Sequence, residues 1–166
     1  MKVTMLFGLA VVTLLLINCK KSNHTTNHVN CDGLVMDTLG TGDNARIFMP
    51  NAFTPNSDGL NDIIKPYTQH VTSIAFTIYD GDNNVVYATS TLGQGWTTTS
   101  SPNTWSVYYY KIQVTTAGGH HIGKCGELYK LSCFPGSIPK NNLYFEDQLT
   151  PLGFTLPTSE SMGTCP

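Results

Sequence analysis

The sequence predicts an all-β protein, an antiparallel β-sandwich of roughly six to seven strands. Two features lead to this prediction. Apolar and polar residues alternate along several short segments, and clusters of Gly, Pro, Asn and Asp separate these segments. No segment keeps a helical period, and 166 residues are enough for a single domain of ordinary size with its own core.

The first strand is expected at residues 46–49, ahead of the segment PNAFTPNSDGLND at residues 50–62. Pro50 and Pro55 cannot donate to a sheet ladder, whereas Asn, Asp and Gly favour turns. We therefore expect an ordered polar loop here, after which Ile63 resumes an apolar run.

Four longer strands are expected further along the chain. They are Val71–Tyr79, Val85–Thr89, 107–115 and 120–132. In the first of them Ile74, Phe76 and Ile78 share one face, which should be buried. Turn residues at 80–84 and 117–119 predict that these strands pair as two hairpins.

The segment at 50–62 resembles the signature of the gliding-motility-associated C-terminal domain, the type B sorting domain of the type IX secretion system. The resemblance continues, less closely, to residue 132 through Gly95 and Trp96, the tyrosines at 108–110, and Gly126. It implies an immunoglobulin-like sandwich that is not an enzyme and that the export machinery recognises.

Three departures from the family pattern leave a sorting role open. The turn after Tyr79 lacks the usual Arg-Trp-Gly, and Trp96 is followed by Thr97 rather than by Asp-Gly. The family domain ends a much larger secreted protein, whereas here residues 134–166 follow the last expected strand. That extension should wrap the sandwich through the apolar residues at 143–145 or through those at 152, 154 and 156; without a disulfide it would be disordered.

The N-terminus resembles a bacterial lipoprotein signal. Lys2 precedes an apolar run at 5–17 that is shorter than a membrane span and ends in Leu-Ile-Asn-Cys. Asn18 stands where Gly or Ala is usual, so an ordinary signal peptide is the alternative. Lipid on Cys19 would anchor the protein to the outer membrane or cell surface, since each buried methylene contributes ~0.8 kcal/mol. The expected divisions are a signal peptide (1–18), a tether and lead-in (19–44), a sandwich (45–133) and an extension (134–166).

Lipidation of one of the five cysteines leaves an even number for disulfides. The four are Cys31, Cys125, Cys133 and Cys165. If 125–133 is one strand, its two cysteines lie about 26 Å apart and cannot bridge. We favour Cys31 with Cys125 and Cys133 with Cys165; the alternatives are that all four are reduced and buried, or that Cys31 lies in a flexible tether.

Three groups of residues are candidates for binding, and no cofactor is required by any motif. Oxygen atoms of Asn56, Asp58, Asn61 and Asp62 could hold Ca²⁺, although Asx turns are the simpler interpretation. Trp96, Trp105 and Tyr109 could form a platform for sugar stacking, with core packing as the alternative. His120 and His121 should project to opposite faces of a strand and are expected to be solvent-exposed.

No catalytic motif is present, and only 12% of the residues are charged, with a formal net charge of -2. Nucleic acid is therefore not an expected partner, because its binding needs clustered Lys and Arg. The leading hypothesis is a non-enzymatic cell-envelope lipoprotein with a sorting-like sandwich that contacts secretion machinery. The second is a surface module that binds glycan or protein; a small hydrolase is a third and would need a cleft with a polarised nucleophile.

Overall fold

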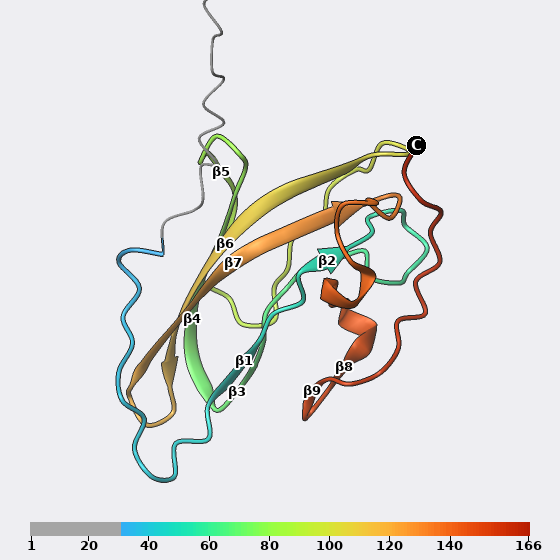
Figure 1. Ribbon diagram of the computed structural model, residues 1–166. Helices are drawn as coiled ribbons and strands as arrows, with labels where there is room; N and C mark the ends of the chain where they lie inside the picture. The colour runs from blue at the N-terminus through green and yellow to red at the C-terminus, as the bar shows by residue number, and fades with distance from the viewer. Residues whose placement is uncertain (1–30) are drawn as a thin grey trace, which may run out of the picture.

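The computed structural model describes residues 31–166 (Figure 1), so the predicted signal peptide and Cys19 lie outside the described residues. Within this range the regular secondary structure is almost entirely β, which confirms the predicted class. The elements are β1 (Arg46–Phe48), β2 (Ala52–Phe53), β3 (Tyr67–Gln69), β4 (Val71–Tyr79), β5 (Val85–Thr89), β6 (Trp105–Thr116), β7 (His121–Leu131), the 3-10 helices η1 (Lys140–Asn142) and η2 (Glu146–Gln148), β8 (Leu149–Thr150) and β9 (Gly153–Phe154).

The main layer is a five-stranded sheet with the order β2-β7-β6-β4-β5. The hairpins β4–β5 and β6–β7 are those predicted, and β2 adds to β7 in parallel. The long β6–β7 hairpin curves across the molecule in Figure 1. The second layer is smaller and consists of the β1–β3 pair and a bridge between Ile64 and Trp96.

The main core lies on the inner face of the five-stranded sheet. Alternation in β4 places Ile74, Phe76 and Ile78 there, all at most 5% exposed, as the sequence predicted. β6 contributes every second residue from Tyr108 to Val114 to the same side, and β2 contributes Phe53. Met49 and Ile64 also belong to this core. Burying each large apolar side chain stabilises the fold by about 1.5–3 kcal/mol.

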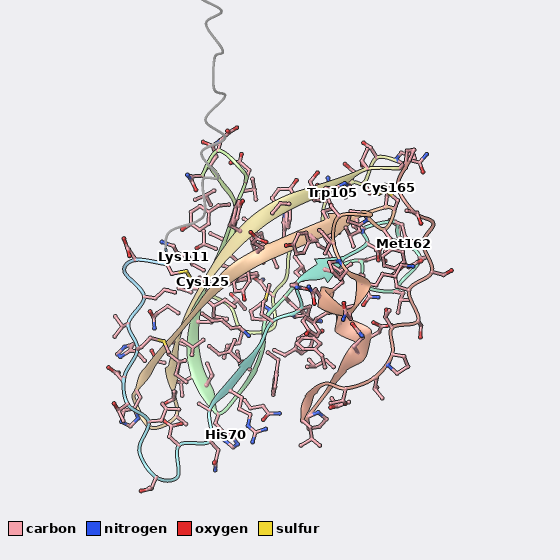
Figure 2. The ribbon with its side chains drawn as sticks, in the orientation of Figure 1. His70, Trp105, Lys111, Cys125, Met162 and Cys165 are labelled. Atoms are coloured by element: carbon pink, nitrogen blue, oxygen red, sulfur yellow. A yellow bond between two sulfur atoms is a disulfide. The ribbon has the colours of Figure 1, made fainter. Side chains whose placement is uncertain are left out.

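Residues 31–45, here called the lead-in segment, run across the outer face of the β6–β7 hairpin. Cys31 is bonded to Cys125, and the Gln113 side chain both accepts from the backbone N–H of Val35 (2.7 Å) and donates to its carbonyl (3.0 Å). Lys111 donates to the carbonyl of Asp32 at 3.1 Å. Figure 2 shows Lys111 and Cys125 on the side of the hairpin along which this segment passes.

Residues 134–166, the C-terminal segment, cover the outer face at the opposite end of the sheet. Leu143 and Phe145 are 2% and 1% exposed and pack with Ala52 and Leu131 in a second apolar cluster. The wrapping predicted from the sequence is thus present. Of the two apolar sets expected as alternatives, the first one inserts, through Leu143 and Phe145, while Tyr144 is 42% exposed. In the second set the 150–153 turn leaves Leu152 83% exposed, Leu156 is 50% exposed, and Phe154 is partly buried beside Tyr144.

Candidate functional site

Residues 50–62, here called the signature segment, contain a polar loop that is held by several internal hydrogen bonds. Its centre is the Asp62 carboxylate, which accepts backbone N–H groups from Asn56 (3.0 Å), Ser57 (2.7 Å) and Gly59 (2.8 Å). Asp58 adds an Asx turn by accepting the N–H of Leu60 at 2.8 Å. One carboxylate that satisfies three amides holds an exposed loop in a single shape.

The loop rests on an aromatic stack. Trp96 lies between Phe53 (ring centroids 5.5 Å apart) and Tyr108 (4.9 Å), and its backbone exchanges two 2.8 Å hydrogen bonds with Ile64. Gly95 allows this approach, because a Cβ there would lie 2.8 Å from the Ile64 carbonyl oxygen. This contact explains why a Gly-Trp pair follows the signature in this chain.

On its other side the signature segment contacts the C-terminal segment through side chains. Thr54 and Asn61 are 1% and 5% exposed, and both donate to one carboxylate oxygen of Glu160, at 2.6 and 3.1 Å. The side-chain carbonyl oxygen of Asn61 accepts the backbone N–H of Asp147 at 3.1 Å. The signature segment is therefore joined to a part of the chain that is about 100 residues away.

The four Ca²⁺ candidates do not all meet. The side chains of Asn56, Asp58 and Asp62 form one hydrogen-bonded network, which confirms the Asx-turn interpretation, whereas Asn61 turns away to the C-terminal segment. Among residues 31–166 no group of three or more His, Cys, Asp or Glu side chains could hold a metal ion. Binding of Ca²⁺ by the loop oxygens stays a prediction.

The three aromatic platform candidates are not on one face. Trp96 is partly buried and packs against the main core, which favours the core-packing alternative for this residue, and its place in a platform stays a prediction. Alternation along β6 puts Trp105 (38% exposed) and Tyr109 on the outer face, opposite the core residues Tyr108 and Tyr110. Burial of Tyr110 raises the pKa of its phenol to about 12. The space that its ring needs is provided by Gly126, where a Cβ would lie 3.0 Å from the ring.

The two adjacent histidines hold the lead-in segment. The Nδ1 atom of His120 lies 3.0 Å from the Asp43 carboxylate, and that of His121 lies 3.1 Å from Asp37. The expectation that both are merely solvent-exposed is incomplete, since His120 is only partly exposed and each of the two has an acidic partner. Sequence reasoning missed these partners because they lie in a Gly- and Asp-rich stretch without periodicity.

The carboxylates in these pairs have lowered pKa values. For Asp43 the main cause is the hydrogen bond from the Thr116 hydroxyl (2.6 Å), assisted by His120. For Asp37 it is the hydrogen bond from the backbone N–H of His121. The Thr116 hydroxyl donates to Asp43 and accepts the backbone N–H of His120 at 3.2 Å.

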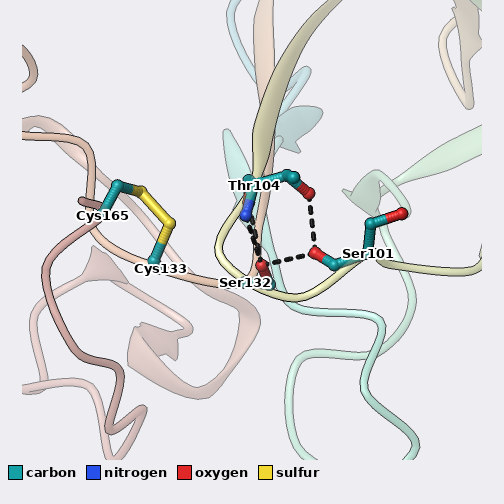
Figure 3. Close-up of a disulfide and its surroundings, with 5 residues drawn as sticks. All are labelled: Ser101, Thr104, Ser132, Cys133 and Cys165. Atoms are coloured by element: carbon teal, nitrogen blue, oxygen red, sulfur yellow. Dashed lines mark hydrogen bonds between the residues drawn. A yellow bond between two sulfur atoms is a disulfide. The ribbon is translucent and has the colours of Figure 1, made fainter.

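Both favoured disulfides are present. Cys31 is joined to Cys125 with the Cα atoms 5.9 Å apart, and Cys133 to Cys165 with the Cα atoms 5.0 Å apart. Figure 3 shows how the second bridge is placed: Ser132, beside Cys133, donates from its hydroxyl to the carbonyls of Ser101 (2.8 Å) and Thr104 (2.9 Å). These contacts fix the end of β7 from which the C-terminal segment departs.

Two shallow clefts of about 420 and 410 Å³ lie where the C-terminal segment meets the sandwich. Glu146 lines both; it accepts a hydrogen bond from Tyr67 and pairs with Lys65 at 3.4 Å. No Ser, Cys or His lines either cleft. Within the described part of the chain, no helix has the length and apolar character that a bilayer crossing requires.

Comparison with known proteins gives one result. The family described as CHU_C Type IX secretion signal domain matches residues 47–129, half of the 166-residue chain. The matched region begins in β1, contains the whole signature segment (50–62), and ends in β7. No curated protein and no solved structure matches the chain.

Proposed function

Since the chain belongs to the family of type IX secretion signal domains, we propose that it is a non-enzymatic cell-envelope lipoprotein whose sandwich is an attachment and recognition module. In this proposal the lipid on Cys19 holds the protein at the outer membrane or cell surface. The signature segment is the part that the export machinery contacts. The observation that carries the proposal is the family match over the sandwich, together with the fixed and exposed loop inside it.

The loop is suited to recognition because its shape does not depend on a partner. Asn56, Ser57 and Asp58 are exposed, while Asp62 fixes their backbone from within. A loop that is already ordered loses little conformational entropy on binding. Replacing Asp62 with Ala removes the acceptor for three amides and should disorder the loop without touching the core.

Export is tested by fusing residues 1–166 to a fluorescent reporter in a bacterium with an active type IX system. We expect the reporter at the cell surface, and its loss from the surface both when the system is inactivated and in the Asp62→Ala variant. Asp82→Ala, in the exposed β4–β5 turn, is the matched control and should be exported normally. Surface display that does not depend on the system would refute the sorting role.

Anchoring is tested separately by incorporation of radiolabelled palmitate. The wild-type chain should take up label, and Cys19→Ala should not. Protease treatment of intact cells then distinguishes the cell surface from the periplasm. A wild-type chain without label would remove the anchor from the proposal while leaving the export experiment informative.

A second candidate, a surface module that binds glycan or protein, is supported by the outer face of β6. Trp105 is 38% exposed there, and Tyr109 projects from the same face of the strand. Exposed aromatic rings stack on sugars and anchor protein interfaces. Binding to a glycan array that is lost in Trp105→Ala, but kept in Asp62→Ala, would favour this candidate over the first.

A further inference from the structure

Three polar side chains of the signature segment, Asn51, Thr54 and Asn61, form hydrogen bonds with the C-terminal segment. The Asn51 side chain accepts the N–H of Tyr144 (2.6 Å) and donates to the carbonyl of Asn142 (2.9 Å). The backbone N–H groups of Asn51 and Ala52 both donate to the Tyr144 carbonyl, at 2.9 and 3.2 Å. These contacts involve only main-chain atoms of residues 142–144. A peptide with other side chains at these positions could therefore make the same hydrogen bonds.

Specificity for side chains comes from the residues on either side of Tyr144. Leu143 and Phe145 point into the apolar cluster with Ala52 and Leu131, whereas the Tyr144 side chain is 42% exposed. The groove therefore selects an apolar residue, then any residue, then an aromatic residue. This spacing is that of an extended strand laid along the β2 edge of the sheet.

A second selective position recognises a carboxylate. Thr54 and Asn61 are buried and both donate to Glu160, and the remaining side-chain acceptor of Asn61 takes the N–H of Asp147. Neither hydrogen bond of the Asn61 side chain is made within residues 47–129.

We propose that β2 and the side chains of Asn51, Thr54 and Asn61 form a peptide-binding groove, and that residues 142–160 of this chain are its tethered occupant. The same groove accepts in trans an extended peptide of a partner with an apolar residue, an aromatic residue two positions later, and a carboxylate placed for Thr54 and Asn61. In the intact chain the tethered segment competes at an effective concentration on the order of millimolar.

The test uses the full chain with its own segment displaced by Phe145→Asp and Glu160→Ala. The probe is a fluorescent peptide with the sequence of residues 141–162. It should bind the displaced variant at least about tenfold more tightly than it binds the intact chain. Adding Asn51→Ala and Asn61→Ala to the displaced variant should abolish this binding.

Variants of the probe peptide check the two selective positions. Replacing Glu160 or Phe145 in the peptide should weaken binding at least about tenfold, because each change removes a buried contact. Leu152→Ala, at a residue that is 83% exposed in the chain, is the matched control and should bind like the parent peptide. A displaced variant that keeps the near-ultraviolet circular dichroism of Trp96 but binds no peptide overturns the proposal, as does equal binding of all the peptides.

Hydrogen exchange of the unaltered chain decides the matter if the displaced variant does not fold. The amides of Tyr144 and Asp147, which donate to Asn51 and Asn61, should exchange at least about tenfold faster than those of Ile112 and Leu128 in the main sheet, because the groove opens by itself. Equal protection at both places would mean that the groove never empties, and the proposal would be wrong.

Discussion

At the scale of single residues, close contacts decide which positions tolerate change. Gly95 and Gly126 have different neighbours but the same function: each leaves room for another group, the Ile64 backbone in one case and the Tyr110 ring in the other. The resemblance to the family indicated both positions. The physical reasons for these glycines could not be predicted from the sequence, because the groups that they make room for come from other parts of the chain.

Gly95→Ala should destabilise the protein by about 2–3 kcal/mol, since the new Cβ would lie 2.8 Å from a backbone oxygen that cannot move without breaking the Ile64–Trp96 bridge. Urea denaturation followed by tryptophan fluorescence measures the change. Gly136→Ala, at a glycine with no atom within 4 Å of its Cβ position, should be nearly neutral. Equal effects at the two glycines would contradict this account.

The Asp43 carboxylate predicts a dependence of stability on pH. Its side chain is 5% exposed, and hydrogen bonds lower its pKa in the folded protein. A lowered pKa means that the contribution to stability is complete above the unfolded value of about 3.9 and is lost as pH falls through the folded value. Asp43→Asn should therefore be less stable than wild type at pH 7, and the difference should shrink below pH ~4.

Thermal unfolding between pH 2 and pH 7 tests this prediction, with Asp82→Asn in the β4–β5 turn as the control. His120 faces the same carboxylate, so His120→Gln should show part of the same loss near neutral pH. A stability difference between Asp43→Asn and wild type that stays constant to pH 2 would show that the carboxylate acts only by its shape.

At the scale of elements, long regular strands could be predicted from the sequence and short ones could not. The alternation of apolar and polar residues predicts β4 and β5 with the same first and last residues that the structure has. By contrast, β2 has two residues, both buried, and joins β7 in parallel, so it has no period that a sequence can display. The two-residue strands β8 and β9 were missed for the same reason.

The disulfide Cys133–Cys165 closes the C-terminal segment into a loop with a sequence separation of 32. Replacing both cysteines with serine should lower the free energy of unfolding by about 2–4 kcal/mol, because the unfolded chain gains freedom. Limited proteolysis should then cut first between residues 155 and 163, where the burial pattern is mostly exposed. Replacing Cys31 and Cys125 is the comparison: it should leave these cleavage sites protected and instead expose the lead-in segment.

At the scale of the whole molecule, the two ends of the described chain cover different ends of one sheet face. The lead-in segment lies over β6 and β7 near His121, and the C-terminal segment lies over β2 and β7 near Leu131. The family match from 47 to 129 includes no residue of either segment. Their packing could be expected only from the cysteine count and from apolar residues that would otherwise face water.

The disulfides also shorten the covalent route through the molecule. From Cys31 the route passes directly to Cys125, follows β7 to Cys133, and passes directly to Cys165. In single-molecule stretching between the two termini, the oxidised protein should therefore show no unfolding step from the other strands. Reduction should release roughly 450 Å of additional length, and a similar step in the oxidised protein would contradict the described pairing.

In the function proposed above, lipid on Cys19 holds the N-terminal end of the protein at the cell. A force on the C-terminal end would then put the molecule under tension. Tension that enters at Cys31 leaves at Cys165 after crossing a single strand of about 26 Å. The signature segment and both hairpin turns lie on side branches that carry none of this load. The signature segment, which we propose as the recognition surface, would therefore keep its shape while the molecule is under tension.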